Sequence, residues 1–349
     1  MKLRLIIAIA VIAIAAAGWY AFNALYGHNP FDTRRTVTIP AGSHASSIVD
    51  SLERAGVLRS RTSFMIALRV LGKENELHPG VYELPAHASN REIILTLALA
   101  RGHHTEVTFP EGITSMAMAR IAASRLSCDS AKFVALVRDT VFMRSLGVDG
   151  VSLEGYLFPE TYAFDLPVQE RDVVARMVRA MDKFLDDSLR ARIAALGLKE
   201  QQALTLASIV EGEAVADTER PRIAGVYWNR LKRHMRLEAD PTIQYIVGSP
   251  RRLSYDDLRI DSPYNTYMVT GLPPGPICNP GRASILAATN PAPRDRSIYF
   301  VADGQGGHAF AISIADHNRN VARWKDIQRQ RQEQGLPPAP SSPPPPAKP

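Results

Sequence analysis

The stretch of residues 203–214 carries the acidic groups that are best placed to do chemistry. Its run of Leu, Ala, Ile and Val predicts an apolar helix, and Leu204, Ala207 and Glu211 share one side of it because they follow an i, i+3, i+7 spacing. A carboxyl group held over apolar side chains loses hydration, and this loss raises its pKa. Because a carboxyl that keeps its proton near neutral pH can act as a general acid, Glu211 is the candidate catalytic residue.

A second glutamate competes for this role. Glu213 follows two residues later and faces another direction, and the periodicity of the helix does not choose between the two acids. The alternative for either is an ordinary edge glutamate whose head group reaches water. A glycoside hydrolase of the usual kind also needs a second carboxylate across the bond, and the candidates are Glu213, Asp240 and Asp261.

The composition of the chain limits the other functions that it can have. Its 349 residues are 46% hydrophobic and 22% charged, which suits two globular domains with a sizeable core. The net charge of +6 comes from 41 basic and 35 acidic residues spread along the chain. This pattern disfavours nucleic-acid binding and is compatible with an anionic surface or polymer. Cys128 and Cys278 have no CxxC partner, and either one disulfide or two thiols would fit the sequence.

Motifs for metals, nucleotides and other hydrolases give no competing prediction. The G-x-S-x-G, H-E-x-x-H and P-loop patterns do not occur, and the histidines lack ligand spacing. Residues 304–309 formally match a dinucleotide fingerprint, but a strand is predicted after them where the fingerprint requires a helix. We therefore expect neither a metal nor a cofactor.

The amino-terminal residues predict a membrane anchor. No charged residue occurs from Leu5 to Tyr26, and at about 1.5 Å per residue this run spans a hydrocarbon core of roughly 30 Å. Trp19 lies where an interfacial aromatic belt would begin, and the basic residues before the run place residues 1–4 in the cytoplasm. We expect a transmembrane helix at residues 5–26 and a linker at residues 27–35. A cleaved signal peptide is the alternative, because residues 15–17 are all alanine.

Two strand–turn–helix units are predicted in residues 36–104. Residues 36–39 alternate like a strand, and after a turn Ser43 is expected to cap a helix. Residues 80–84 and 93–99 repeat the strand and the helix. This order resembles the LysM-like module of cell-wall proteins, and the alternative is a spacer domain that binds nothing.

The larger region, residues 105–333, is predicted to mix helices with a carboxyl-terminal hairpin. Helices are expected near residues 116–126, 131–137, 173–196 and 223–231, with Asp217 as a cap before the last one. Strands at residues 298–301 and 308–312 flank a glycine-rich turn. Aromatic residues flank two acids in residues 153–162, which suits either sugar binding or a closed core. Residues 334–349 form a proline-rich tail that we expect to be disordered.

Several separated segments together resemble the YceG-like (MltG) endolytic murein transglycosylases. The helix segment LASIVEGE at residues 206–213 resembles the active-site helix of that family. Gly212 departs from the pattern, since many members have a larger residue there, and we expect it to loosen the helix. The other matching segments are residues 154–162, 227–231, 240–242, 264–267, 271–275 and 299–304.

The resemblance implies an α+β protein of the bacterial inner membrane, with its amino terminus in the cytoplasm and its catalytic domain in the periplasm. It implies cleavage of the β-1,4 bond between N-acetylmuramic acid and N-acetylglucosamine in nascent peptidoglycan strands, with formation of a 1,6-anhydro end that terminates elongation. Peptidoglycan synthases are candidate partners. The resemblance also implies that the catalytic residue is the first glutamate of the E-x-E pair, which is Glu211 in this sequence.

The substrate groove is expected in the loop-rich region after residue 236, because rigid loops with polar side chains suit a polyhydroxyl substrate. The alternative function is a catalytically silent protein that binds peptidoglycan and serves as a scaffold for the cell-wall synthesis machinery. The residues expected to bind substrate are Glu213, Thr242, Gln244, Tyr245, Tyr264 and Asn265.

Overall fold

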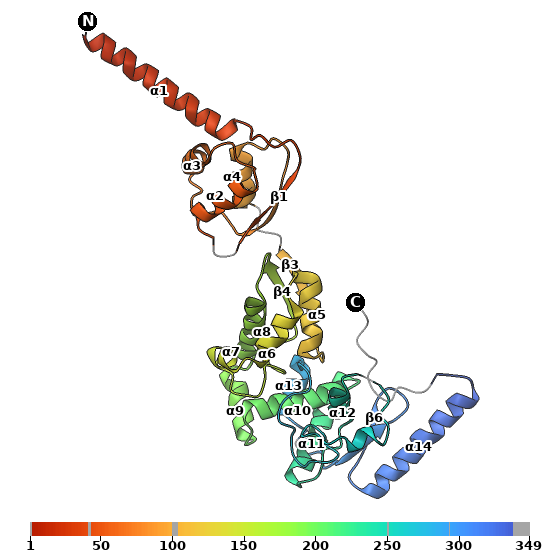
Figure 1. Cartoon of the computed structure of the whole chain (residues 1–349). Helices are drawn as coiled ribbons and strands as arrows, with labels where there is room; N and C mark the ends of the chain where they lie inside the picture. The colour runs from red at the N-terminus through yellow and green to blue at the C-terminus, as the bar shows by residue number, and fades with distance from the viewer. Residues whose placement is uncertain (1, 41–42, 100–103, 250, 293, 338–349) are drawn as a thin grey trace. The chain divides into compact units, whose positions relative to one another are not determined.

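The computed structural model describes residues 2–40, 43–99, 104–249, 251–292 and 294–337 (Figure 1). Helices dominate, and the strands form three two-stranded sheets, which confirms the predicted α+β class. The chain divides into two compact units. One contains residues 1–107, 124–127 and 162–169, and the other contains residues 108–123, 128–161 and 170–349.

The first helix, α1 (Lys2–Tyr26), is the one helix in the described part of the chain that is long and apolar enough to cross a membrane. Its window Ile9–Tyr26 has a mean hydropathy of 1.6, and only 6% of that window is buried in the protein. Trp19 is 68% exposed. Because these side chains face outward and are not packed into a core, the helix is suited to anchor the protein in a lipid bilayer.

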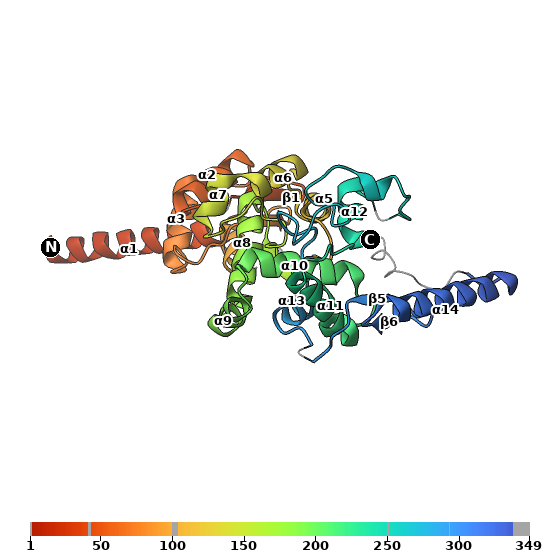
Figure 2. The same ribbon diagram turned by 90° about the horizontal axis from the view of Figure 1, so that it is seen from below.

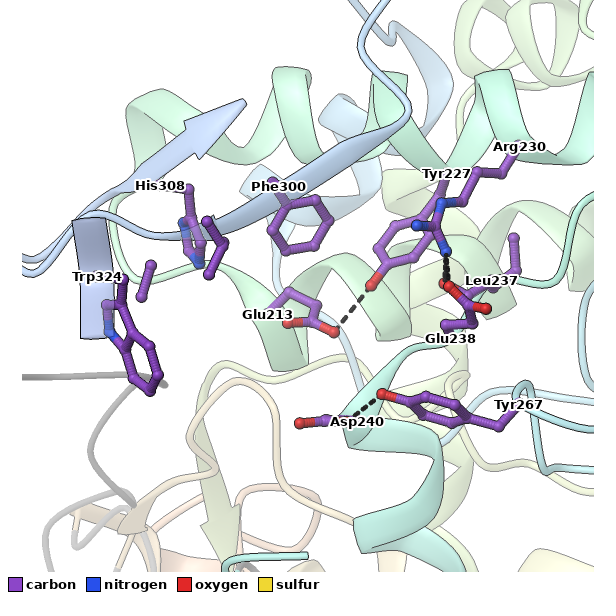
Figure 3. Close-up of a pocket in the computed structure, with 12 residues that line it drawn as sticks. Glu213, Tyr227, Arg230, Leu237, Glu238, Asp240, Tyr267, Phe300, His308 and Trp324 are labelled. Carbon is purple, nitrogen blue, oxygen red and sulfur yellow. Dashed lines mark hydrogen bonds and ion pairs between the residues drawn. The ribbon is translucent and has the colours of Figure 1, made fainter. Parts of the chain in front are cut away.

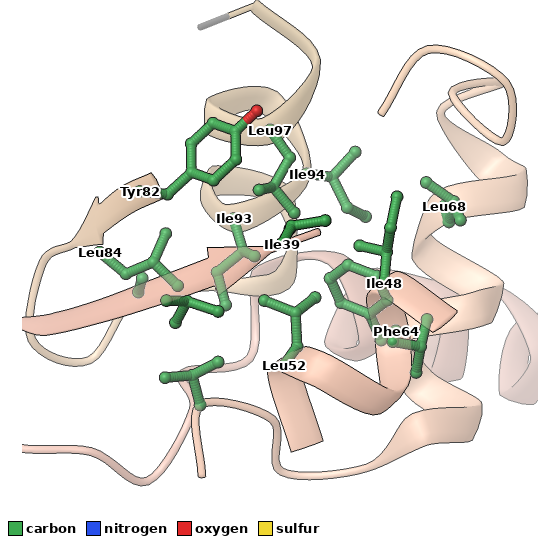
Figure 4. Packing of buried hydrophobic residues seen from close by; sticks show 14 of the residues in the cluster. Ile39, Ile48, Leu52, Phe64, Leu68, Tyr82, Leu84, Ile93, Ile94 and Leu97 are labelled. Atoms are coloured by element: carbon green, nitrogen blue, oxygen red, sulfur yellow. The ribbon is translucent and has the colours of Figure 1, made fainter. Parts of the chain in front are cut away.

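The smaller unit is built on an antiparallel pair of strands covered by short helices. The strands β1 (Arg35–Ile39) and β2 (Gly80–Leu84) pair with Val37 opposite Tyr82. Alternate side chains of both strands point into an apolar core that the helices complete (Figure 4). The helices are α2 (Ala45–Arg54), α3 (Arg61–Val70) and α4 (Asn90–Leu99), and a second strand pair joins β3 (His104–Thr108) to β4 (Thr161–Asp165).

Both predicted strands of this unit are confirmed, but the predicted cap is wrong. The first residue before α2 is His44, so Ser43 lies one position too early to cap the helix. Helix α3 was not predicted. Its amino terminus is capped by Ser60, whose hydroxyl accepts from the backbone N–H of Ser63, and this serine is the signal that was missed.

The larger unit consists mainly of helices (Figure 1). Among its described residues it contains the hairpin of β5 (Tyr299–Ala302) and β6 (His308–Ala311), which confirms the predicted hairpin. The helices are α5 (Ser115–Leu126), α6 (Ser130–Arg138), α7 (Thr140–Ser145), α8 (Glu170–Phe184), α9 (Asp187–Ala195), α10 (Glu200–Glu213), α11 (Arg220–Lys232), α12 (Asp240–Val247), α13 (Arg282–Thr289) and α14 (Ile314–Glu333), with short 3-10 turns at Asp217–Glu219 and Asp257–Arg259.

Helix α10 is the central element of this unit. All residues from Ala203 to Val210 are buried, and the helix packs against α11, α12 and α13 (Figure 2). Gly212 does not loosen it, because the helix continues to Glu213. A Cβ atom at Gly212 would lie 2.6 Å from Cβ of Pro241, so the glycine allows α12 to approach the end of α10 closely.

Three boundaries differ from the sequence-based expectation. The helix expected at residues 173–196 is two helices, because Asp186 caps α9 through the backbone N–H of Leu189. Asp217 begins a 3-10 turn and does not cap α11. The loop expected around Asp240 contains α12, whose eight residues are too few to show clear helical periodicity. The predicted tail at residues 334–349 lies mostly outside the described residues.

Candidate active site

The last turn of α10 directs its two glutamates to different surroundings. Residues two positions apart on an α-helix point about 200° away from each other. The apolar residues of α10 before these glutamates are buried on every side of the helix. The helix therefore has no exposed face along which the two acids could point into water. Each acid is therefore fixed by the groups that it meets.

Glu213 faces a pocket of about 270 Å³ (Figure 3). One side of the pocket is aromatic and comes from α11, from the hairpin β5–β6 and from α14. The other side carries acids and a tyrosine from the segment around α12. The lining residues are Glu213, Tyr227, Arg230, Leu237, Glu238, Asp240, Tyr267, Phe300, Val301, Ala302, His308 and Trp324.

The surroundings of Glu213 favour its protonated form. Burial raises its pKa to about 7, and the negative charge of Asp240 acts in the same direction. The Tyr227 hydroxyl donates a hydrogen bond of 2.8 Å to Oε1, and this bond and the charge of Arg230 oppose the shift. The hydroxyl of Tyr227 is itself buried, which raises its pKa well above the usual value and keeps it a donor. Glu213 is thus a carboxylic acid that can hold a proton close to neutral pH.

A second carboxylate faces the same pocket. Asp240 is the first residue of α12, and the hydroxyl of Tyr267 donates to its Oδ1 over 2.6 Å. Burial raises the pKa of Tyr267, and the adjacent Asp240 raises it further. The third acid of the pocket, Glu238, is paired with Arg230 at 2.9 Å.

Glu211 faces the other side of α10 and has different partners. Its Oε1 accepts a hydrogen bond of 3.2 Å from Arg220, and its Oε2 accepts one of 2.9 Å from the backbone N–H of Gly281. Its side chain is 8% exposed and that of Arg220 is 10% exposed. Arg220 also binds Asp217 and Ser284. Glu211 therefore joins the end of α10 to the beginnings of α11 and α13.

A third acid, Glu111, lies beside Glu211. Burial raises the pKa of Glu111, and the charge of Glu211 adds to this shift. The carboxyl of Glu111 fills the space in front of Gly281, where a Cβ atom would lie 2.0 Å from its Cδ. Glu111 itself is exposed to solvent, so the cluster of Glu111, Glu211 and Arg220 reaches the surface of the unit, while the side chains of Glu211 and Arg220 are mostly covered.

Two of the expected substrate-binding residues have a structural role in the fold. Asn265 and Thr242 are both 0% exposed. The Asn265 amide donates to the carbonyls of Leu258 and Ile260, and its Oδ1 accepts from the backbone N–H of Tyr267. The Thr242 hydroxyl bonds to the carbonyl of Ala239 and to Thr266. Their polar groups hold the loops around α12 together, and their contact with substrate stays a prediction.

Of the other residues expected to bind substrate, one lines the pocket and three do not. Tyr245 and Tyr264 lie with their ring centroids 5.1 Å apart, and burial raises the pKa of both hydroxyls. Gln244 is half-buried and only distantly contacts the carbonyl of Arg251. None of these three lines the pocket, whereas Glu213 does.

Sequence reasoning missed the aromatic and tyrosine components of the pocket. Tyr227 and Arg230 share a face of α11 through their i, i+3 spacing, and this pattern was available in the sequence. Phe300 and His308 come from opposite strands of the hairpin, and Trp324 comes from α14. No local pattern brings these three together, because their meeting depends on the packing of the unit.

Comparison with known proteins identifies the family. The sequence model of the YceG-like family matches residues 37–323. An endolytic murein transglycosylase of Bacillus subtilis (strain 168) is 32% identical over 319 residues, which cover 86% of this chain and 88% of that protein. One of Streptococcus pneumoniae (strain D39) is 31% identical over 347 residues, and the match covers 88% of this chain and 62% of that protein.

A solved structure has the same fold. The crystal structure of a YceG-like protein from Listeria monocytogenes superposes with a TM-score of 0.58 at 31% sequence identity, covering 82% of this chain and 98% of that one. The family match covers the smaller unit from residue 37 onward and every residue that lines the pocket except Trp324. This chain belongs to the YceG-like family.

Proposed function

We propose that this protein is an endolytic murein transglycosylase, which cleaves the β-1,4 bond between N-acetylmuramic acid and N-acetylglucosamine within peptidoglycan strands. Relatives that are 31–32% identical carry that name, and the match extends over most of the chain. The observation that carries the proposal is the pocket around Glu213. It offers a half-buried acid with a pKa of about 7 next to aromatic side chains that suit a sugar.

We assign the proton donor to Glu213 and not to Glu211. Glu213 lines the pocket and its pKa is raised by burial, so it holds a proton where a substrate can bind. Glu211 is enclosed by Arg220 and Gly281 and does not line this pocket. In this assignment Glu211 positions the end of α10, and with it the acid two residues later.

The reaction needs one acid that later acts as a base. Glu213 donates its proton to the glycosidic oxygen, and the C1–O bond breaks with its electron pair moving to that oxygen, so N-acetylglucosamine leaves with a free 4-hydroxyl. The 6-hydroxyl of the muramyl residue then attacks C1, and its proton passes to the Glu213 carboxylate. The product has a 1,6-anhydro end. An attack within one sugar gains from high effective molarity and requires no activated water.

The test is a digestion of purified glycan strands by wild-type protein, E213Q and E211Q, with the products analysed by mass. We expect wild type to produce 1,6-anhydro ends, and we expect E213Q to lower the rate by roughly 10²–10⁴-fold because the proton donor is lost. Reducing muramyl ends would indicate a hydrolase. A fully active E213Q beside an inactive E211Q would return the catalytic role to Glu211.

The same digestion tests the alternative of a silent scaffold that binds peptidoglycan. Identical product profiles with and without the wild-type protein would favour the scaffold. The pocket favours an enzyme, because a protein that only binds glycan has no need of a buried acid with a raised pKa.

The place of action follows from the anchor. We propose that α1 spans the inner membrane with its amino terminus in the cytoplasm, so that the pocket lies in the periplasm and reaches nascent strands near the membrane. Cleavage there would terminate strand elongation, and peptidoglycan synthases are the proposed partners. Residues 36–104, which lie within the smaller unit, are proposed to form a LysM-like domain that contacts the same strands.

A further inference from the structure

The pocket contains a carboxylate to which the reaction above gives no role. Asp240 lines the same pocket as Glu213, and Figure 3 shows both carboxyl groups among the side chains that surround it. The negative charge of Asp240 is one cause of the raised pKa of Glu213, which places the two groups within electrostatic reach. Asp240 is therefore close to wherever the bond that Glu213 protonates will lie.

Asp240 is held in place but is not neutralised. Its Oδ1 accepts the hydrogen bond from Tyr267, and among the described residues no hydrogen bond to Oδ2 and no ion pair of Asp240 is found. The other acid on this side, Glu238, is paired with Arg230. Within the part of the pocket that the structure describes, Asp240 is thus the acid other than Glu213 that has no cationic partner.

Several buried polar groups fix the position of Asp240. Asn265 accepts a hydrogen bond from the backbone N–H of Tyr267, and Tyr267 in turn binds Asp240. The backbone N–H of Ala239, the residue before Asp240, donates to Thr266 over 2.9 Å. On the other side, Pro241 lies against Gly212 at the end of α10. Asp240 is exposed to solvent, and these contacts keep its carboxylate in register with Glu213.

We propose that Asp240 is a second catalytic residue, whose carboxylate stabilises the positive charge that develops at C1 and the ring oxygen of the muramyl sugar as the glycosidic bond breaks. The inference rests on the proposed transglycosylase function. Glycosidic cleavage proceeds through an oxocarbenium-like transition state, and a fixed negative charge beside the sugar stabilises such a state. No bond to Asp240 forms, and no proton passes to it.

The decisive variant is D240N, which keeps the shape and the acceptor oxygen but removes the charge. We expect kcat on purified glycan strands to fall by roughly 10²–10³-fold, with KM changed by less than about threefold, because the lost interaction is strongest in the transition state. The products should still carry 1,6-anhydro ends. Y267F should lower kcat by about tenfold, because Asp240 is still charged but is no longer held.

The matched control is D261N. Asp261 is the other aspartate that the sequence offered as a second carboxylate, and it is exposed and does not line the pocket. We expect its kcat and KM to equal those of wild type. Melting temperatures of all three variants separate a loss of fold from a loss of charge.

A second readout distinguishes a catalytic from a structural role. Removing the charge of Asp240 should lower the pKa of Glu213 and shift the alkaline limb of kcat/KM to lower pH, with Tyr227 and Arg230, which also act on Glu213, unchanged. Y267F, in which Asp240 is still charged, should not show this shift to the same extent.

The outcomes separate the two proposals. A folded D240N with wild-type kcat and an unshifted limb would overturn the role of Asp240 while the transglycosylase function stands. If D240N folds poorly, an unchanged kcat in Y267F would count against the catalytic role of Asp240. Wild-type protein that releases no 1,6-anhydro ends would overturn the proposed function itself.

Discussion

At the scale of single residues, two glutamates two positions apart have opposite surroundings. Glu211 has a cationic partner and a backbone donor, whereas Glu213 has one tyrosine hydroxyl and a neighbouring negative charge. A desolvated carboxyl that forms no ion pair favours its neutral form. Glu211 and Glu213 are therefore the same residue type, but their surroundings favour different roles.

This difference predicts an unusual dependence of stability on pH. The pKa of Glu213 is raised from 4.5 in the unfolded chain to about 7 in the folded protein, so the folded state binds more protons between these values and loses stability as pH rises through them. The loss is at most about 3 kcal/mol. E213Q cannot ionise, and we expect its melting temperature to exceed that of wild type at pH 8 and to approach it at pH 5.

E211Q is the matched control for this melting experiment. It leaves Arg220 buried without its carboxylate, and we expect it to lower the melting temperature at pH 8. If the melting temperatures of wild type and E213Q differ by the same amount at pH 5 and at pH 8, the pKa of Glu213 is not raised.

The buried amide of Asn265 yields a second prediction at this scale. N265A removes three hydrogen bonds and leaves two carbonyls and one N–H without partners, which should cost about 2–4 kcal/mol in the free energy of unfolding. Q244A is the control, because Gln244 makes only one contact of 3.5 Å and should cost less than about 0.5 kcal/mol. Urea titrations measure both. A raised KM in Q244A would instead restore its role in substrate binding.

At the scale of elements, the site depends on how closely α12 approaches the end of α10. Gly212 and Pro241 make this contact, and it brings Asp240 to the pocket that Glu213 lines. A glycine in the last turn of a helix costs stability relative to alanine, so its presence here is explained by the space that Pro241 needs.

G212A tests this contact. The added methyl would lie 2.6 Å and 2.8 Å from two atoms of Pro241, so α12 must shift, and we expect a loss of about 1–3 kcal/mol in the free energy of unfolding together with a lower kcat. G225A in α11 is the control. Its methyl would meet Ala292 at ordinary distances of 3.6–3.7 Å, and it should be neutral or stabilise by up to about 1 kcal/mol. If G212A and G225A change the free energy of unfolding equally, the close contact between Gly212 and Pro241 is not important for stability.

The elements themselves were largely predictable from the sequence, and the site was not. The strands β1 and β2, the hairpin β5–β6 and helix α10 were predicted because their apolar periodicity is strong. Helix α12 was missed because it is short and begins in a segment rich in polar and proline residues. The periodicity of the helix did not choose between the two glutamates, and the family resemblance pointed to Glu211. Which side of α10 faces the pocket depends on Tyr227, Tyr267 and Trp324, which approach from other elements.

At the scale of the whole molecule, the chain combines an apolar helix with two compact units. The first part of α1 is exposed, but Ala24 is buried, and the Asn90 amide donates to its carbonyl. The end of α1 is therefore part of the smaller unit, and only the preceding residues are available to a membrane.

Deletion of residues 2–20 should separate these two roles. We expect the full chain to remain in the membrane fraction after a carbonate wash and the shortened chain to become soluble, with an unchanged melting temperature because residues 21–26 are kept. A shortened chain that stays in the membrane fraction would mean that another surface binds the membrane.

The orientation can be measured with a cysteine at the other end of the described chain. In the variant Q334C the new thiol lies on an exposed residue, whereas Cys128 and Cys278 are buried. We expect a membrane-impermeant maleimide to label Q334C in spheroplasts, because the pocket is proposed to lie in the periplasm. Labelling only after lysis would reverse the proposed orientation.

The central claim is that Glu213 holds the proton that begins the reaction, and the pH dependence of kcat/KM for the wild-type protein on purified glycan strands tests it most directly. The raised pKa predicts a rate that falls on the alkaline side with a midpoint near 7, as the acid loses its proton. A rate that instead falls with a midpoint near 4.5, the ordinary value for a glutamate, would contradict the assignment of Glu213 as the proton donor.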